Sequence, residues 1–267
     1  MTDDCIATIK DGVGIIELAR PNKFNCISPD MLGVILGAVQ RFAVDPNVQV
    51  VLVRGQGRNF CVGADLNEVK ALRDSPGNLR QFLELGSHTL DFIETLPKPV
   101  IAAVQGFCLA GGFELSLACD IVVAARGAKF GDQHAEFGLY PGWGGARRMV
   151  RLLGPRRSFD LMATAQRVDA CTAGDWGLVT KVVDDEALAD ESWQFCQLLK
   201  TRSAAGLLEM KKAVLRTIYE GCQSDDSYDI EAGIRTITGA DAAEGVAAFE
   251  QRRPPVFLSR IGERKND

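Results

Sequence analysis

One carboxylate lies in the most apolar segment of the sequence. Every residue from Val100 to Cys119 is uncharged except Glu114, which follows a pair of glycines. The apolar neighbours predict a helix that is buried on most sides. Burial disfavours the charged form of a carboxyl group and raises its pKa, as a general acid or base working near neutral pH requires. Glu114 is therefore a candidate catalytic residue. The alternative is structural, because a Glu in a helix's first turn can accept hydrogen bonds from free N–H groups.

Two glycine-containing turns supply candidate hydrogen-bond donors beside this carboxyl group. Gly111 and Gly112 leave the backbone bare at the predicted start of the helix, where N–H groups point outward. A second turn, Gly63-Ala64-Asp65, follows a predicted strand. One N–H group from each turn can converge on a developing oxyanion, and such a donor contributes about 2.7–4 kcal/mol where it has been measured. A carboxylate beside two such donors is suited to proton transfer next to a thioester carbonyl.

Composition and absent motifs limit the other functions. The 267 residues fit one large domain, or a main domain with a small appendage. A net charge of −5 argues against nucleic acid or an acidic membrane surface as a partner. The sequence contains no dinucleotide-binding glycine motif, Walker motif, G-x-S-x-G elbow or H-E-x-x-H motif, and only two histidines, His88 and His134.

The cysteines and the N-terminus predict the compartment. The eight cysteines are scattered and none forms a C-x-x-C pair. We therefore expect reduced thiols, no metal site and a reducing compartment. The first residues show no basic start before an apolar core, which predicts no secretory signal and a cytoplasmic protein.

Strands that alternate with helices predict an α/β core. The predicted strands span residues 5–10, 13–19, 48–55, 100–104 and 120–125, with a short extended piece at 129–130. Asp11-Gly12 is a strong turn signal between the first two strands, and residues 56–69 are predicted as a loop. Helices are predicted from Ser28 to about Phe42, over 79–95, and over nearly all of the chain from about 147 to 253. The apolar run 100–125 is long enough to cross a membrane, but its glycines and acids favour a buried strand–turn–helix–strand.

Five segments together resemble the enoyl-CoA hydratase/isomerase (crotonase) family. They are GRNFCVGADLNEV, KPVIAAVQGFCLAGGFELSLACDIVVAARGAKFG, GLYPGWGGARRMVRLLG, DWGLVTKVVDDEAL and EGVAAFEQRRPPVF. The resemblance covers the chain from about Ile6 to Phe257. It implies an α/β fold, a crotonase-like spiral of ββα units with a C-terminal helical trimerisation region. Residues 1–200 would form the spiral core with the acyl-CoA site, and residues 201–267 the helical assembly region.

The resemblance also implies a ligand and an assembly. The substrate would be a coenzyme A thioester, with no metal and no permanently bound cofactor. The chain would assemble as a homotrimer or as a hexamer, a dimer of trimers. Ala64 and Gly111 match the two positions whose N–H groups bind the thioester oxygen, and Glu114 matches the first of two catalytic glutamates. The residues implied in binding substrate or coenzyme A are Lys23, Asn25, Cys61, Ala64, Asp65, Leu66, Gly112 and Trp143. Trp143 is open to two interpretations, core packing or a wall of the acyl pocket.

The sequence departs from the family at the second catalytic glutamate. His134 occupies that position, and Glu136, two residues later, is expected to point elsewhere. An imidazole can donate or accept a proton near pH 7, so His134 is the second candidate catalytic residue. The leading hypothesis is hydration of the C2=C3 double bond of an acyl-CoA. The alternatives are isomerisation, hydrolysis or decarboxylation of an acyl-CoA, or a non-catalytic acyl-CoA-binding protein.

Two other features are interpreted as structural. Five arginines lie close together: Arg147, Arg148, Arg151, Arg156 and Arg157. We expect them to form a solvated helix face with paired charges, and the alternative is that they hold coenzyme phosphates. His88 is also expected to be structural.

Overall fold

The chain forms two β-sheets surrounded by helices. The computed structural model describes residues 4–72, 75–220 and 227–262. The larger sheet has the strand order β1-β2-β3-β4-β6-β9, in which only the β1–β2 pair is antiparallel. Its strands are β1 (Cys5–Lys10), β2 (Val13–Leu18), β3 (Val50–Gly55), β4 (Val100–Val104), β6 (Ile121–Ala125) and β9 (Lys181–Val183). The smaller sheet contains β5 (Phe107–Leu109), β7 (Lys129–Gly131) and β8 (Val168–Asp169), in that order.

Helices connect most of the strands and make up most of the C-terminal part. The α-helices are α1 (Pro29–Val44), α2 (Leu66–Leu72), α3 (Pro76–Thr95), α4 (Gly111–Leu117), α5 (Gly145–Thr164), α6 (Ala170–Asp175), α7 (Leu188–Lys200), α8 (Ala204–Glu220), α9 (Ser227–Ile237) and α10 (Ala240–Glu250). Short 3-10 helices are η1 (Pro21–Lys23), η2 (His134–Phe137) and η3 (Asp185–Ala187).

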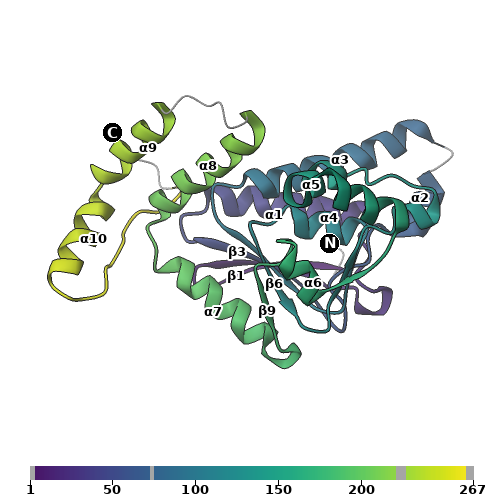
Figure 1. Ribbon diagram of the computed structural model, residues 1–267, viewed down its shortest axis with the longest axis horizontal. Helices are drawn as coiled ribbons and strands as arrows, with labels where there is room; N and C mark the ends of the chain where they lie inside the picture. Colours follow the sequence, from purple (N-terminus) through teal and green to yellow (C-terminus); the bar gives the residue numbers. More distant parts are fainter. Residues whose placement is uncertain (1–3, 73–74, 221–226, 263–267) are drawn as a thin grey trace.

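The larger sheet is covered by helices on both faces. Successive side chains of a strand point to opposite faces, so Val51 and Val53 of β3 enter one hydrophobic cluster while Val50 and Leu52 enter another. Helices α1, α3 and α4 pack on the first face and α7 on the second (Figure 1). Burial on both faces explains why these strands read as continuous apolar runs.

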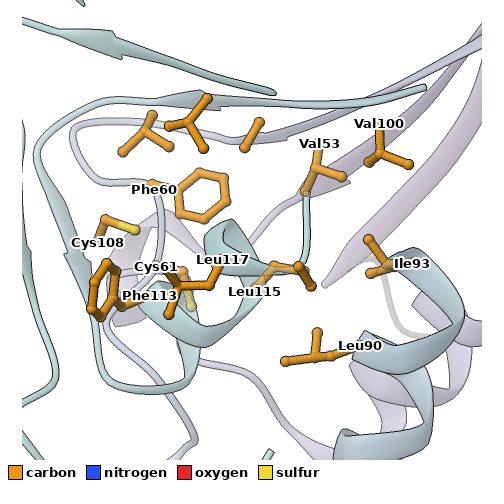
Figure 2. Packing of buried hydrophobic residues seen from close by; sticks show 14 of the residues in the cluster. Val53, Phe60, Cys61, Leu90, Ile93, Val100, Cys108, Phe113, Leu115 and Leu117 are labelled. Carbon is orange, nitrogen blue, oxygen red and sulfur yellow. The ribbon is translucent and has the colours of Figure 1, made fainter. Parts of the chain in front are cut away.

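Helix α4 lies inside the first cluster. All seven of its residues are buried, which confirms the predicted buried helix. In Figure 2, Leu115 and Leu117 of α4 lie among Phe60, Leu90 and Ile93. Replacing one such buried leucine with alanine typically costs about 2–5 kcal/mol. The position of α4 is therefore fixed by packing on several sides, and so is the backbone of any functional residue on it.

Several local predictions are confirmed. Asp11 and Gly12 form the turn of the β1–β2 hairpin, and the hydroxyl of Ser28 accepts a 3.2 Å hydrogen bond from the Met31 N–H at the start of α1. Residues 100–125 form the expected strand, turn, helix and strand, with one additional short strand, β5, that was not predicted between the turn and the helix. Among the helices of the described residues, none has both the length and the hydropathy needed to span a membrane.

Two local predictions are wrong. The predicted loop over 56–69 ends early because Leu66–Leu72 forms α2, where the Asp65 carboxylate accepts a hydrogen bond from the Asn67 N–H. The predicted nearly continuous helix from 147 to 253 is interrupted by β8 and β9. Strand β9 has only three residues and pairs with β6, far away in the sequence. So short a strand has no periodicity of its own, and its formation depends on its partner.

The last three helices extend away from the larger sheet (Figure 1). Lys211 of α8 forms a 2.7 Å ion pair with Asp120, just before β6, and so ties α8 to the core. Several large apolar side chains on α9 and α10 are exposed, including Ile237 and Phe249. The predicted boundary at residue 200 coincides with the end of α7, and as a domain boundary it stays a prediction.

Candidate active site

The predicted catalytic and oxyanion-hole residues line one cavity. This cavity, of about 490 Å³, is bounded by Ala64, Gly111, Glu114 and His134 together with apolar side chains. A second cavity, of about 350 Å³, shares Ala64, Leu66, Val69, His134, Phe137 and Leu139 with it. The two cavities therefore adjoin, and His134 lies where they meet.

Glu114 is nearly fully buried, and its two carboxylate oxygens have different surroundings. Oε1 accepts hydrogen bonds from the N–H groups of Trp143, at 2.9 Å, and Gly145, at 2.8 Å. Gly145 is the first residue of α5, so this oxygen caps a neighbouring helix rather than its own. Oε2 lies 3.8 Å from Nε2 of His134. The structural and catalytic interpretations of Glu114 are thus compatible, with one oxygen for each role.

Burial has the largest influence on the pKa of Glu114. Desolvation raises its pKa to about 7, although the charge of His134 and the two backbone hydrogen bonds act in the opposite direction. A carboxyl group with this pKa can exchange a proton at neutral pH. The pKa expected from the apolar sequence context thus agrees with the structure.

Gly145 allows the close approach of α5 to Glu114. A Cβ atom at this position would lie 2.7 Å from Cγ and 2.9 Å from Oε1 of Glu114. Any larger residue would push the carboxylate away from the helix end. The sequence predicted a role for Trp143 but none for Gly145, two residues later.

His134 begins η2 and is held by Asp132. The Asp132 Oδ1 atom accepts a 3.2 Å hydrogen bond from the His134 backbone N–H and lies 3.0 Å from Nδ1 of the ring. Burial by itself lowers the pKa of His134, but the hydrogen bonds and charge of Asp132, together with the charge of Glu114, leave it raised. The role of Asp132 was not predicted from the sequence, because its position two residues before a histidine is not distinctive.

The two glycine-containing turns, at residues 63–65 and 110–112, lie next to each other as predicted. A Cβ atom at Gly63 would lie 2.9 Å from the Cβ atom of Ala110 and 3.1 Å from the Gly111 nitrogen. In residues 4–72, 75–220 and 227–262, neither the Ala64 nor the Gly111 N–H group donates a hydrogen bond to the protein. Both residues line the larger cavity, so both amides are available to a ligand there.

Backbone strain accompanies the second turn. Ala110 has φ 47° and ψ −123°, a conformation that favours glycine. Its N–H group donates to the Gly131 carbonyl at 3.0 Å, and its carbonyl accepts from the Glu114 N–H at 2.9 Å. Such strain costs about 1–3 kcal/mol and persists only where the surroundings impose it. Ala110 thereby sets the direction of the adjacent Gly111 N–H group.

Besides Ala64, three of the predicted binding residues line the cavities. Lys23 is exposed at the smaller cavity, and Leu66 contributes to both. Trp143 lines the larger cavity while its ring packs edge-on against Phe82, with ring centroids 5.5 Å apart. Both interpretations of Trp143 therefore hold, since it is a core residue and a cavity wall.

Asn25, a predicted binding residue, lines neither cavity. Asn25 is fully buried, and its amide nitrogen donates to the carbonyls of Gln56 and Asn59. Its Oδ1 atom accepts from the Arg20 N–H. The side chain joins two backbone segments and has no polar atom left for a ligand.

Three other predicted binding residues lie behind the cavity walls. Cys61 and Gly112 are buried against each other, since a Cβ atom at Gly112 would lie 2.4 Å from the Cys61 carbonyl oxygen. Asp65 forms a 3.1 Å ion pair with Arg20. None of the three lines either cavity. Their positions indicate support of the site rather than contact through their side chains.

The arginine cluster is not a solvated helix face at Arg148. This side chain is buried between α3 and α5 and pairs with Asp91, at 2.6 Å, and Glu94, at 2.8 Å. Its Nη1 atom donates to the Trp143 carbonyl at 2.8 Å. The prediction of a solvated face is wrong there, and the guanidinium group is not available to phosphates.

His88 and Glu136 were not predicted to be catalytic, and neither lines the larger cavity. His88 is exposed on α3 and lines neither cavity, whereas Glu136 lines the smaller cavity but not the larger one that contains Glu114. In the described residues, no three His, Cys, Asp or Glu side chains are grouped to hold a metal ion. Seven cysteines have free thiols, and Cys222 lies outside the described residues.

Fold and site together define a class of protein: an α/β protein with a carboxyl group and an imidazole beside two accessible main-chain amides. The profile described as enoyl-CoA hydratase/isomerase matches residues 8–260. The chain belongs to the enoyl-CoA hydratase/isomerase family, which confirms the predicted family and its α/β crotonase fold.

Individual relatives cover nearly the whole chain. The chain is 34% identical to a crotonyl-CoA hydratase from Syntrophomonas wolfei, over 97% of this chain and 99% of the relative. It is 32% identical to a 1,2-epoxyphenylacetyl-CoA isomerase from Escherichia coli, over 97% and 100%. The crystal structure of an enoyl-CoA hydratase from Bacillus anthracis superposes with a TM-score of 0.89 and 30% identity, covering 98% of this chain and 100% of that one. The protein is an enzyme of this family.

Proposed function

We propose that the enzyme adds water across the C2=C3 double bond of an acyl-CoA thioester. The observation that carries this proposal is the position of Glu114 and His134, 3.8 Å apart in the cavity that also contains the Ala64 and Gly111 amides. Two proton-transfer groups beside two hydrogen-bond donors match the needs of hydration. The similarity to a crotonyl-CoA hydratase supports the same reaction.

Each group has a defined task in this reaction. The thioester oxygen accepts hydrogen bonds from the Ala64 and Gly111 N–H groups, which stabilise the enolate as it forms. Glu114 removes a proton from a water molecule while the water oxygen bonds to C3. The π electrons of the double bond move toward the thioester, and C2 then takes a proton from His134. The product carries a hydroxyl group on C3 and a new hydrogen on C2.

The cavity walls favour an uncharged acyl group. Beyond Glu114, His134 and Lys70, the larger cavity is lined mainly by apolar and aromatic residues: Leu66, Val69, Leu79, Phe82, Leu83, Phe137, Leu139, Tyr140 and Trp143. Coenzyme A is part of the substrate in this proposal. Its pantetheine arm would run along the smaller cavity, with Lys23 near the phosphates.

The direct test is the loss of enoyl-thioester absorbance with crotonyl-CoA and with a series of longer apolar enoyl-CoAs. We expect turnover by the wild type and a large loss in Glu114→Gln. Absence of turnover over the whole series would refute hydration. Mass spectrometry separates the alternatives, because hydration adds one water, isomerisation leaves the mass unchanged, hydrolysis frees the coenzyme thiol and decarboxylation releases carbon dioxide.

Isomerisation is the second candidate function. One base that shuttles a proton is sufficient for moving a double bond, and Glu114 alone could be that base. The similarity to an epoxyphenylacetyl-CoA isomerase supports this alternative. A product of unchanged mass that requires Glu114 but tolerates His134→Gln would favour it over hydration.

We further propose a homotrimer or a hexamer in the cytoplasm. Exposed apolar side chains on α9 and α10, such as Ile237 and Phe249, support burial of these helices against other copies. Sedimentation equilibrium of the full chain tests the assembly, and a monomer at micromolar concentration would contradict it. Cell fractionation tests the location.

A further inference from the structure

Asp132 is a buried carboxylate for which the proposed hydration step has no direct use. It lies between β7 and η2 and is 1% exposed. Oδ1 binds both the backbone N–H and the ring of His134. Oδ2 is buried and, within the described part of the chain, has no hydrogen-bond partner. A buried carboxylate with an unpartnered oxygen is costly, so Asp132 calls for a functional explanation.

The contact with Nδ1 determines what the other ring nitrogen can do. An ionised carboxylate only accepts hydrogen bonds, so Asp132 requires a proton on Nδ1. The hydrogen bond at one imidazole nitrogen sets the state of the other. Nε2 is thereby directed toward Glu114, 3.8 Å away. A positive charge on the ring also balances the Asp132 carboxylate.

The turn that joins these two residues is held under strain. Gln133 has φ 61°, in the left-handed region. Its side chain is fixed at both ends, because Nε2 donates to the Ala165 carbonyl and Oε1 accepts from the Arg167 guanidinium group at 2.8 Å. Such strain persists only where the surroundings impose it. The Asp132–His134 contact is therefore built into the fold.

We propose that Asp132 is a positioning residue that fixes a proton on Nδ1 of His134 and keeps the ring charged, with Nε2 toward Glu114. His134 is then the proton donor to C2, and Glu114 is the base that activates water. This division of roles rests on the proposed hydration. The Asp132–His134 contact itself does not depend on it.

The arrangement also closes the proton cycle. After one turnover Glu114 carries the proton taken from water, and His134 has lost the proton given to C2. Transfer of one proton from Oε2 of Glu114 to Nε2 of His134 restores both groups. The separation of 3.8 Å requires a small approach of the two side chains or one bridging water. No proton has to come from bulk solvent.

Among ionisable side chains, Asp132 and Glu114 contribute most to the charge environment of His134. The cavities that it lines also contain ionisable groups: Lys23, Cys26, Glu136 and Arg167 in the smaller one and Lys70 in the larger one. The Arg167 guanidinium group is held by Gln133. Replacement of Asp132 by asparagine therefore removes the negative charge in direct contact with Nδ1 and leaves the other groups in place.

The test combines nitrogen-15 NMR of the histidines with steady-state kinetics of Asp132→Asn. The chain has only two histidines, so exposed His88 is an internal reference, and His134→Gln assigns the signals. In the wild type, we expect the neutral His134 ring to retain its proton on Nδ1. In Asp132→Asn, we expect the His134 titration midpoint to move to lower pH and that of His88 to stay unchanged.

The kinetic expectation is a loss in kcat of about 10²–10⁴-fold in Asp132→Asn, the usual contribution of a general acid or base, with KM nearly unchanged. Asp190→Asn, an exposed change on α7 on the other face of the sheet, should match the wild type. A wild-type His134 ring whose neutral form carries its proton on Nε2 would overturn the proposal, even if the variant fails to fold. Unchanged kcat in Asp132→Asn would also overturn it.

Failure of the proposed function has a different signature. If the wild type hydrates no enoyl-CoA but the NMR results are as expected, hydration is wrong and the positioning of His134 by Asp132 stands. If the wild type hydrates crotonyl-CoA while Asp132→Asn is equally active, hydration stands and the role of Asp132 is wrong.

Discussion

Two clusters of buried charge lie on either side of the backbone segment 143–145. On one side, Arg148 pairs with Asp91 and Glu94 and donates a hydrogen bond to the Trp143 carbonyl. On the other side, Glu114 accepts hydrogen bonds from the Trp143 and Gly145 N–H groups. The same short segment thus connects an ion-pair cluster to the candidate active site.

The two clusters differ in how completely their polar atoms are paired. The Arg148 guanidinium group has a carboxylate or carbonyl partner at Nε, Nη1 and Nη2. In the site, Oε2 of Glu114 has only the His134 ring at 3.8 Å, and Oδ2 of Asp132 has no partner in the described residues. Complete pairing stabilises a structure, whereas incomplete pairing leaves groups that can exchange protons. We therefore expect the Arg148 cluster to stabilise the folded protein and the Glu114 cluster to carry out proton transfer.

The largest expected effect concerns catalysis at Glu114. Glu114→Gln keeps the shape and an oxygen that can accept the two backbone hydrogen bonds, but it removes the proton acceptor. We expect kcat to fall by about 10²–10⁴-fold while the protein remains folded. Turnover of crotonyl-CoA and the circular dichroism spectrum measure the two quantities. A variant with wild-type kcat would show that Glu114 is not a catalytic residue. The two clusters would then not differ in function.

The next effect concerns stability at Arg148. Arg148→Met removes the buried cation that pairs with both Asp91 and Glu94, while Arg151 still pairs with Glu94 at 2.9 Å. Breaking a buried pair costs about 3–5 kcal/mol, and we expect the lower end because Glu94 keeps this second partner and Asp91 is partly exposed. Urea unfolding measures the change. Arg147→Met is the matched control, since Arg147 contacts the same Asp91 but is 40% exposed, and an exposed pair contributes about 0–1 kcal/mol. Equal effects in the two variants would contradict the assignment of stability to the buried arginine.

The third effect is a pH dependence of the free energy of unfolding, which we expect from Glu114 in the active site and not from the Arg148 cluster. The pKa of Glu114 is about 7 in the folded protein against an ordinary value of 4.5, so the folded state binds the proton more tightly. Any destabilisation from ionising Glu114 is absent below pH 4.5 and grows as pH rises to about 7. It reaches at most about 3.5 kcal/mol, since one pKa unit corresponds to about 1.4 kcal/mol.

Urea unfolding at pH 5 and pH 8 measures this dependence. Glu114→Gln should gain stability relative to the wild type between the two pH values, because glutamine does not ionise. The raised pKa of His134 has the same sign, since its contribution is present at low pH and lost as pH rises through the folded value. A constant difference between variant and wild type would show that Glu114 has an ordinary pKa.

The sequence predicted those parts of the fold and site that depend on local pattern. The apolar runs of β3 and β4 and the buried α4 are evident because each is long enough to show its burial. Glu114 and His134 are evident from their type and context. The internal hydrogen bonds of Asn25 were not predictable, because a motif identifies a segment but not which of its atoms are already hydrogen-bonded. Contacts between distant segments, such as Gly145 with Glu114, were not predictable because only folding brings them together.

The smallest expected effect is the change in stability when Gly145 is replaced by alanine, compared with the same change at another helix glycine. Gly145→Ala places a methyl group against Glu114, and such overpacking costs about 1–3 kcal/mol. We expect lower stability together with a loss of kcat, because the carboxylate shifts from the end of α5. The matched control is Gly37→Ala in α1, where a Cβ atom meets nothing within 4 Å. Alanine there should stabilise the helix by about 0.5–1 kcal/mol.

Urea unfolding and crotonyl-CoA kinetics distinguish the two glycine variants. Opposite signs of the stability change are expected, with kcat reduced only in Gly145→Ala. If Gly145→Ala is as active and as stable as the wild type, the contact between α5 and Glu114 does not restrict position 145. The link between the ion-pair cluster and the active site would then rest on the backbone N–H groups of residues 143 and 145, which the variant retains.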